Sequence, residues 1–126
     1  MEIDAAAAAA LAPTVRPRAA IVRADAAAMP FGNARFDGAV AMVMLHHLPS
    51  VEWQDRLFRG VARILRPGGL FVGVECVDSR ALRLLHVGDP LVLVAPATLA
   101  ARLGRAGFAA AKVDIRSHFF RFRATR

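Results

Sequence analysis

Two adjacent histidines, His46 and His47, follow an apolar run that has the length of a buried strand. A histidine beside an acceptor hydroxyl group can act as a general base, because the ordinary pKa of imidazole lies close to neutrality. In the structural alternative, one histidine caps the next helical region and the other packs against a loop. Successive side chains of an extended backbone point in opposite directions. We therefore expect at most one of the pair to be catalytic, and we expect no metal site built from them.

Acidic residues stand at the ends of two further predicted strands. Asp25 closes the short apolar segment 19–24, and Glu2 lies where a strand before the first helix would end. Ligands of open α/β sheets bind at the carboxyl ends of the strands. One carboxylate there can accept hydrogen bonds from a ribose diol, and a second can accept one from an adenine amino group. A single acid would fit a polar strand end or a helix cap equally well, whereas two in succession favour a nucleoside-shaped ligand.

The elements that must position these residues alternate between helices and strands. The alanine-rich segment 5–12 predicts a helix that Asp4 caps and that Pro13 and Pro17 end. The apolar run 37–45 predicts a strand buried on both faces. The other predicted elements are strands at 19–24 and 70–75, helices at 51–65 and 96–106, a helix or lid-like loop at 78–87, and hairpin strands at 110–116 and 118–123. This order predicts an α/β fold with a mostly parallel sheet, helices on both faces and an antiparallel hairpin at its edge.

The composition is that of one folded domain and excludes several classes of protein. The chain has 126 residues, enough for one domain, and its 56% hydrophobic content can fill a core. The net charge of +7 permits contact with nucleic acid, but the arginines are spread along the chain, so a solvated surface is the simpler interpretation. The single cysteine, Cys76, excludes an internal disulfide and suits the reducing cytoplasm. No apolar segment is long enough to span a membrane.

Three segments in this order carry a family resemblance. They are "EID" at 2–4, "VRADAAAMPFGNARFDGAVAMVMLHHL" at 22–48 and "ARILRPGGLFVGVE" at 62–75. The chain resembles a class I S-adenosylmethionine-dependent methyltransferase of the small-molecule, methyltransferase type 11-like group, and the resemblance extends over nearly its whole length. It implies a Rossmann-like fold, S-adenosyl-L-methionine as the cofactor and a small molecule as the methyl acceptor.

The same resemblance implies roles for individual residues. Glu2 would hold the ribose hydroxyls of the cofactor, and Asp25 would accept a hydrogen bond from the adenine amino group. The remaining cofactor contacts would come from Ala26 and Met29 beside the adenine ring, and from the backbone around Ala41 and Met42 facing the methionine part.

A glycine-rich turn precedes the ribose-binding acid in this family, whereas only Met1 precedes Glu2 here. The family's first strand lies between its second and fourth strands. We therefore expect residues 1–126 to form a partial methyltransferase domain that begins at the end of the second strand. The strand at 37–45 should then have an exposed apolar edge, and cofactor binding should be poor. A partner chain that supplies the missing strand is the alternative.

The leading functional hypothesis is methyl transfer from S-adenosylmethionine to a small-molecule acceptor, impaired in this short chain. A non-catalytic binding or scaffold protein of the same fold is a second hypothesis, favoured by the missing glycine turn. A nucleic-acid-binding module is a third, because aromatic residues and arginines alternate over 118–123 and could stack on bases. Alternation is equally typical of a strand with one packed face.

Overall fold

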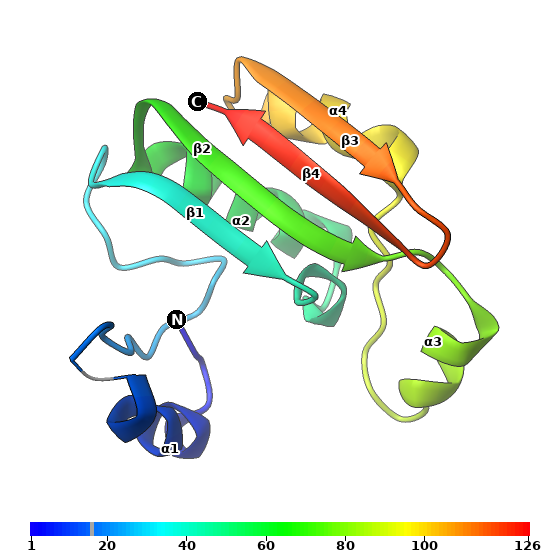
Figure 1. Ribbon diagram of the computed structural model, residues 1–126, viewed down its shortest axis with the longest axis horizontal. Helices are drawn as coiled ribbons and strands as arrows, with labels where there is room; N and C mark the ends of the chain where they lie inside the picture. Colours follow the sequence, from blue (N-terminus) through cyan, green and yellow to red (C-terminus); the bar gives the residue numbers. More distant parts are fainter. Residues whose placement is uncertain (16) are drawn as a thin grey trace.

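The computed structural model describes residues 1–15 and 17–126, and its helices and strands alternate along the chain as expected (Figure 1). In chain order the elements are α1 (Ala5–Val15), β1 (Phe36–Met42), the 3₁₀ turn η1 (Leu45–His47), α2 (Val51–Ile64), β2 (Leu65–Cys76), α3 (Arg80–Leu85), α4 (Pro96–Arg105), β3 (Ala110–Ile115) and β4 (Phe119–Thr125). The α/β fold class is confirmed.

The sheet has the strand order β1-β2-β4-β3. β1 and β2 are parallel, whereas β4 runs antiparallel to both β2 and β3, so three of the four strands point the same way. The hairpin lies at the edge of the sheet as expected, with β3 outermost and its second strand, β4, between β2 and β3. The reason is burial, since Phe120, Phe122 and Ala124 of β4 all face the core and need neighbours on both sides.

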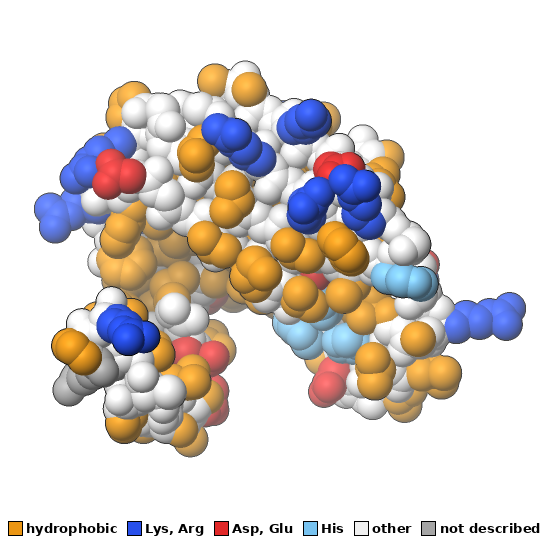
Figure 2. All heavy atoms as spheres, viewed as in Figure 1, with side chains coloured by type: hydrophobic (Ala, Val, Ile, Leu, Met, Phe, Trp, Pro, Cys, Tyr) orange, Lys and Arg blue, Asp and Glu red, His pale blue; other side chains and the backbone are white. Residues whose placement is uncertain are grey.

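The helices α2 and α4 lie on the same face of the sheet (Figure 1). Both crossovers, β1–α2–β2 and β2–α4–β3, move in the same direction across the sheet, and right-handed connections therefore place both helices on one side. The expected helices on the second face are not found there in the described chain, since α1 and α3 stand apart from the sheet. Hydrophobic side chains of the uncovered face are visible in Figure 2, and two of them, Val40 and Met42, are 67% and 59% exposed.

The core lies between the sheet and the helices α2 and α4. Its fully buried side chains include Phe58 of α2, Leu99 and Leu103 of α4, and Phe71 of β2. Ser50 caps α2 by accepting a hydrogen bond from the N–H of Trp53 over 3.3 Å. Arg102, buried on α4, donates from Nε to the carboxylate of Asp55 over 2.7 Å and so ties the two helices together. The helices α2 and α4 match their predicted ranges closely, whereas β2 begins at Leu65, five residues before the predicted strand 70–75.

The N-terminal region departs most from the prediction. The strand expected at 19–24 is reduced to one parallel bridge between Glu2 and Arg23. The segment opposite it is short, because the helix α1 begins at Ala5. Pro13 was expected to end α1 but lies inside it. The φ angle of proline is helical, so near a helix end it removes one hydrogen bond without stopping the helix.

The strand β1 is an edge strand and is not buried on both faces. Ala41 is its one buried residue, and no other described strand pairs with its free edge. The expectation of an exposed apolar edge is confirmed. Such an edge presents unpaired backbone groups that invite another strand.

Gly73 provides a test of sheet packing. A Cβ at this position of β2 would overlap the ring of Phe122 and lie 2.6 Å from the carbonyl oxygen of Ala41. We expect Gly73→Ala to destabilise the fold by about 2–3 kcal/mol through overpacking. Gly104→Ala on α4, where a Cβ meets nothing within 4 Å, should be neutral or should stabilise by up to about 1 kcal/mol. Urea denaturation followed by circular dichroism measures both, and equal midpoints would contradict the observed β2–β4 register.

Candidate active site

A buried carboxylate–imidazole pair occupies the carboxyl ends of β1 and β2. Glu75 is fully buried, and its Oε1 lies 2.7 Å from Nδ1 of His46, which is also buried. The N–H groups of Leu45 and His46 donate to Glu75 Oε2 over 2.7 and 3.2 Å, and that of Cys76 donates to Oε1 over 3.2 Å. Both carboxyl oxygens therefore act as acceptors. The hydrogen on Nδ1 of His46 then points to Glu75, which leaves the lone pair of His46 on Nε2.

Two further elements clamp the loop that carries the histidines. Gln54 of α2 donates from Nε2 to the carbonyl oxygens of Leu45 and Val92 over 3.1 and 2.8 Å. The N–H of Val92 in turn donates to the carbonyl oxygen of His46 over 2.9 Å. The position of η1 is thus fixed from the sheet, from α2 and from the segment that leads to α4.

A third histidine, His86, joins the pair from the end of α3. The ring centroids of His46 and His47 are 4.2 Å apart, and the ring of His86 lies 5.0 and 5.2 Å from them. Figure 2 shows the pale blue histidine atoms gathered beside α3. His86 donates from Nδ1 to the carbonyl oxygen of Leu82 over 2.8 Å. Partial burial lowers the pKa of His47, and positive charge on His46 or His86 would lower it further.

The premise that the two adjacent histidines point apart on an extended backbone is wrong. The strand β1 ends at Met42, Val43 turns the chain with a φ of 49°, and His46 and His47 lie in the 3₁₀ turn η1. Such a positive φ is costly for a β-branched residue and is held in place only by its surroundings. In a 3₁₀ turn successive side chains are about 120° apart, so neighbouring rings can meet.

The two acids of the predicted nucleoside site lie in the N-terminal region, where one bridge joins the segments that carry them. Glu2 pairs with Arg23, two residues before Asp25. Glu2 Oε1 accepts hydrogen bonds from the N–H groups of Ile3 and Asp4 over 2.8 and 3.0 Å, and Asp25 Oδ1 accepts one from Ala27 over 2.7 Å. These bonds orient each carboxylate through one oxygen. The bridge thus sets Glu2 opposite Arg23, two residues before Asp25 in the chain.

Asp4 has the capping role that the sequence predicts. Its Oδ1 accepts a hydrogen bond from the N–H of Ala7 over 2.7 Å, in the first turn of α1. This leaves Glu2 as the acid at the strand end.

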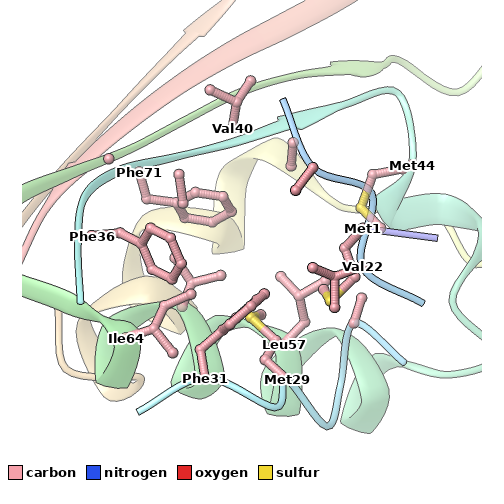
Figure 3. Close-up of a pocket in the computed structure, with 16 residues that line it drawn as sticks. Met1, Val22, Met29, Phe31, Phe36, Val40, Met44, Leu57, Ile64 and Phe71 are labelled. Carbon is pink, nitrogen blue, oxygen red and sulfur yellow. The ribbon is translucent and has the colours of Figure 1, made fainter. Parts of the chain in front are cut away.

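An apolar cavity of about 320 Å³ separates the N-terminal segment from β1 and α2. Figure 3 shows that most of its labelled side chains surround the cavity, whereas Val40 points away from it on the other side of β1. Of the residues predicted to contact the cofactor, Ala26, Met29 and Ala41 line this cavity, whereas Glu2, Asp25 and Met42 are not part of the lining. The cavity borders the free edge of β1, where the family's first strand was expected. All the lining residues are apolar, which suits packed side chains better than a charged ligand.

The structure buries two of the three aromatic residues of the nucleic-acid hypothesis and leaves Phe119 exposed. Phe120 and Phe122 of β4 are buried in the core, so they cannot stack on bases. On the other face of β4, Arg121 donates to the carboxylate of Asp114 over 2.9 Å, as Arg116 does over 2.8 Å. The alternation at 118–123 is that of a strand with one packed face.

Comparison with known proteins gives the family. The family model of the "Methyltransferase domain" matches residues 1–73, which is more than half of the chain. The chain belongs to this family. It is 36% identical over 65 residues to the sterol 4-C-methyltransferase of Caenorhabditis elegans and 37% identical over 78 residues to the 27-O-demethylrifamycin SV methyltransferase of Amycolatopsis mediterranei. The matches take in 52% and 62% of this methyltransferase-family chain, but only 19% and 22% of those proteins.

The fold agrees with this family. A solved SAM-dependent methyltransferase from Methanosarcina mazei superposes with a TM-score of 0.75 at 18% identity, over 99% of this chain and 79% of that one. S-adenosylmethionine is the cofactor of the family. None of the helices that the structure describes has the length and apolar character needed to cross a membrane.

Sequence reasoning left Glu75 and His86 without a firm role. Glu75 is the last residue of the predicted strand 70–75, and His86 lies in the predicted helix or lid-like loop 78–87. His86 lies just beyond α3, far along the chain from the histidines of η1. Glu75 and His46 are 29 residues apart in the sequence. Only the parallel pairing of β1 with β2 brings them together.

The Glu75 carboxylate should hold η1 in place. We expect Glu75→Gln to destabilise the protein by about 3 kcal/mol, since a buried amide would face N–H donors and His46 would lose its acceptor. Asp37→Asn is the matched control, because Asp37 bonds Arg66 at an exposed position and should change stability little. Urea denaturation measures both, and the same midpoint for the two variants would show that Glu75 does not stabilise η1.

Proposed function

We propose that this chain forms the acceptor-side part of a small-molecule methyltransferase, in which the carboxyl ends of β1 and β2 face the reacting groups. The observation that supports this proposal is the buried Glu75–His46 pair in a chain of the methyltransferase family. A carboxylate that is fully buried and oriented against an imidazole is typical of a preorganised active site. Cytoplasmic localisation, expected from the reduced Cys76, belongs to the same proposal.

The cofactor would supply a methyl group on a sulfonium, and the residues of this chain would position it. In the proposal Glu2 accepts hydrogen bonds from the ribose hydroxyls, and Asp25 accepts one from the adenine amino group. Both carboxylates have a second oxygen that makes no hydrogen bond among the described residues, so each can take a ligand donor. The remaining contacts proposed from the resemblance are those of Ala26, Met29, Ala41 and Met42.

Of the two adjacent histidines, His47 is the one placed to act as a general base. His46 is 2% exposed and directs Nδ1 to Glu75, so it is a positioning residue. The ring of His47 is exposed, and its side chain makes no hydrogen bond among the described residues. It can therefore take the proton of an acceptor hydroxyl as that oxygen attacks the methyl carbon. The base role applies only where the acceptor atom is an oxygen that carries a proton.

The surface around the cluster favours an apolar acceptor. Leu84, Leu85 and Val87, beside His86, are 74%, 79% and 79% exposed. The relatives named above act, by their names, on a sterol and on a demethylrifamycin. Large apolar molecules with a reactive oxygen or carbon are thus the acceptor class that we propose.

The free edge of β1 and the cavity beside it bear on whether the chain acts alone. We propose that a strand from outside the 126 residues pairs with the free edge of β1, fills the apolar cavity beside it and supplies the glycine turn. The unpaired edge and the wholly apolar lining of the cavity support this. A non-catalytic protein of the same fold is the second candidate function, and the wholly apolar side chains that line the cavity beside β1 favour it.

The length of the protein in its native source tests this completion. We expect an intact mass several kilodaltons above the 13.5 kDa of this chain, because a strand, a turn and a helix take on the order of 30 residues. Mass spectrometry of the protein purified from its native source gives the answer. A mass of 13.5 kDa with a second polypeptide bound would indicate that a partner chain supplies the strand. The same mass without a bound partner would contradict the proposal that a further strand pairs with β1.

Cofactor binding tests the methyltransferase proposal itself. Isothermal titration of the purified native protein with S-adenosylhomocysteine should show binding to one site per chain. We expect Glu2→Gln to weaken it about tenfold, since the charge-assisted bonds to the ribose are lost. Asp4→Asn is a matched loss of charge two residues away that keeps the cap of α1, and it should bind as the unaltered protein does. Absence of binding in the completed protein would favour the non-catalytic alternative.

A further inference from the structure

The histidine cluster has the composition of a metal site. One ring nitrogen from each of His46, His47 and His86 lies within 4.8 Å of the other two. Three imidazoles that converge on one point, with a fourth position open, are the ligand set of many catalytic zinc sites. The rings reach this point from two different elements, η1 and α3, so their meeting is a product of the tertiary fold.

The hydrogen bonds behind the rings fix the form that a metal requires. His46 directs Nδ1 to the carboxylate of Glu75, and His86 directs Nδ1 to the carbonyl oxygen of Leu82, over 2.7 and 2.8 Å. A carbonyl oxygen only accepts, so Nδ1 of His86 carries the hydrogen and Nε2 offers its lone pair. Histidine ligands of metals typically donate their other N–H to a carboxylate or a backbone carbonyl, and both kinds of partner are present here.

The charges around the cluster suit a cation. The carboxylate of Glu75 lies 2.7 Å from Nδ1 of His46. Glu75 is buried directly behind His46, so its negative charge is poorly screened by water.

We propose that His46, His47 and His86 bind one divalent transition-metal ion of the zinc type. Imidazole nitrogens are ligands for zinc, copper and nickel, whereas magnesium and calcium prefer oxygen. With Zn–N bonds of about 2.0–2.1 Å, nitrogens of a tetrahedral site lie about 3.4 Å apart. The widest separation of 4.8 Å must therefore shorten on binding. His47, exposed on η1, and His86, half-buried just beyond the end of α3, are the two rings that would move inward.

This site goes beyond the proposed methyl transfer and does not depend on it. Three histidines would leave a fourth position on the ion, which could take a water molecule or an oxygen of the acceptor. A ring nitrogen bound to the ion has no lone pair for proton abstraction. Metal binding and the base role of His47 are therefore alternative uses of one nitrogen, and an oxygen on the ion would be polarised by the metal instead.

Zinc binding by tag-free protein tests the proposal. Equilibrium dialysis against zinc sulfate, with metal analysis of the protein, should give one zinc per chain. Titration with cobalt(II), whose visible absorption reports the coordination geometry, should give a tetrahedral spectrum that zinc abolishes. We expect His47→Ala and His86→Ala each to weaken zinc binding at least about tenfold, because a lost ligand costs no less than a lost partner behind a ligand.

His118→Ala is the matched control, because His118 is an exposed histidine in the β3–β4 turn, outside the cluster. It should bind zinc as the unaltered protein does. His47→Ala is the decisive variant, since this exposed residue makes no hydrogen bond that the fold needs, and circular dichroism checks that the variant is folded. Equal zinc affinity of His47→Ala and His118→Ala would overturn the proposal. No cofactor is present in this experiment, so its outcome is separate from that of the S-adenosylhomocysteine titration.

Discussion

The burial of the Glu75 carboxylate is the constraint on which the candidate site depends. A charge taken out of water costs several kcal/mol unless hydrogen bonds replace its hydration. Three backbone N–H groups and one imidazole make that replacement, and two of the N–H groups belong to η1. The chain must therefore leave β1 and turn at η1 to bring those groups to Glu75. The positive φ of Val43 is a consequence of this turn, and so is the meeting of His46 with His47.

The C-terminal part of the chain is well packed, whereas the N-terminal part is not. From β1 onward, right-handed crossovers place α2 and α4 on one face, and β4 fills the position between β2 and β3. Gln54 and Val92 then connect the histidine loop to this packed body. The N-terminal segment joins the rest across an apolar cavity, and its own bridge at Glu2 is one residue pair long. The acids proposed for the nucleoside thus lie on the less constrained part.

Local patterns in the sequence were sufficient for most of the elements. The helix α2 follows from apolar residues at helical spacing after the cap Ser50, and β4 follows from strict alternation. The position of β4 inside the sheet could not be predicted in this way, because pairing order depends on which strands compete for the core. The cluster was missed for a related reason, since a dipeptide of histidines gives no sign of a 3₁₀ turn and His86 lies 39 residues beyond His47. The failed strand at 19–24 had the right composition but lacked a neighbour to pair with.

The distribution of constraint within the fold bears on both proposals. The hydrogen bonds that orient the histidines come from the carboxyl ends of β1 and β2, from α2, from α3 and from the segment before α4. None of these bonds involves the described residues before β1. The acceptor side and any metal on it can therefore form without the nucleoside side. The reverse does not hold, because Glu2 and Asp25 face the reacting groups only if the segment that carries them is fixed against β1. A strand in the apolar cavity would provide that contact, since it would pair with β1 on one side and adjoin the N-terminal segment on the other. Pairing of a further strand with β1 thus decides whether the cofactor side of the site can be completed. The histidine cluster depends only on the packed part of the chain.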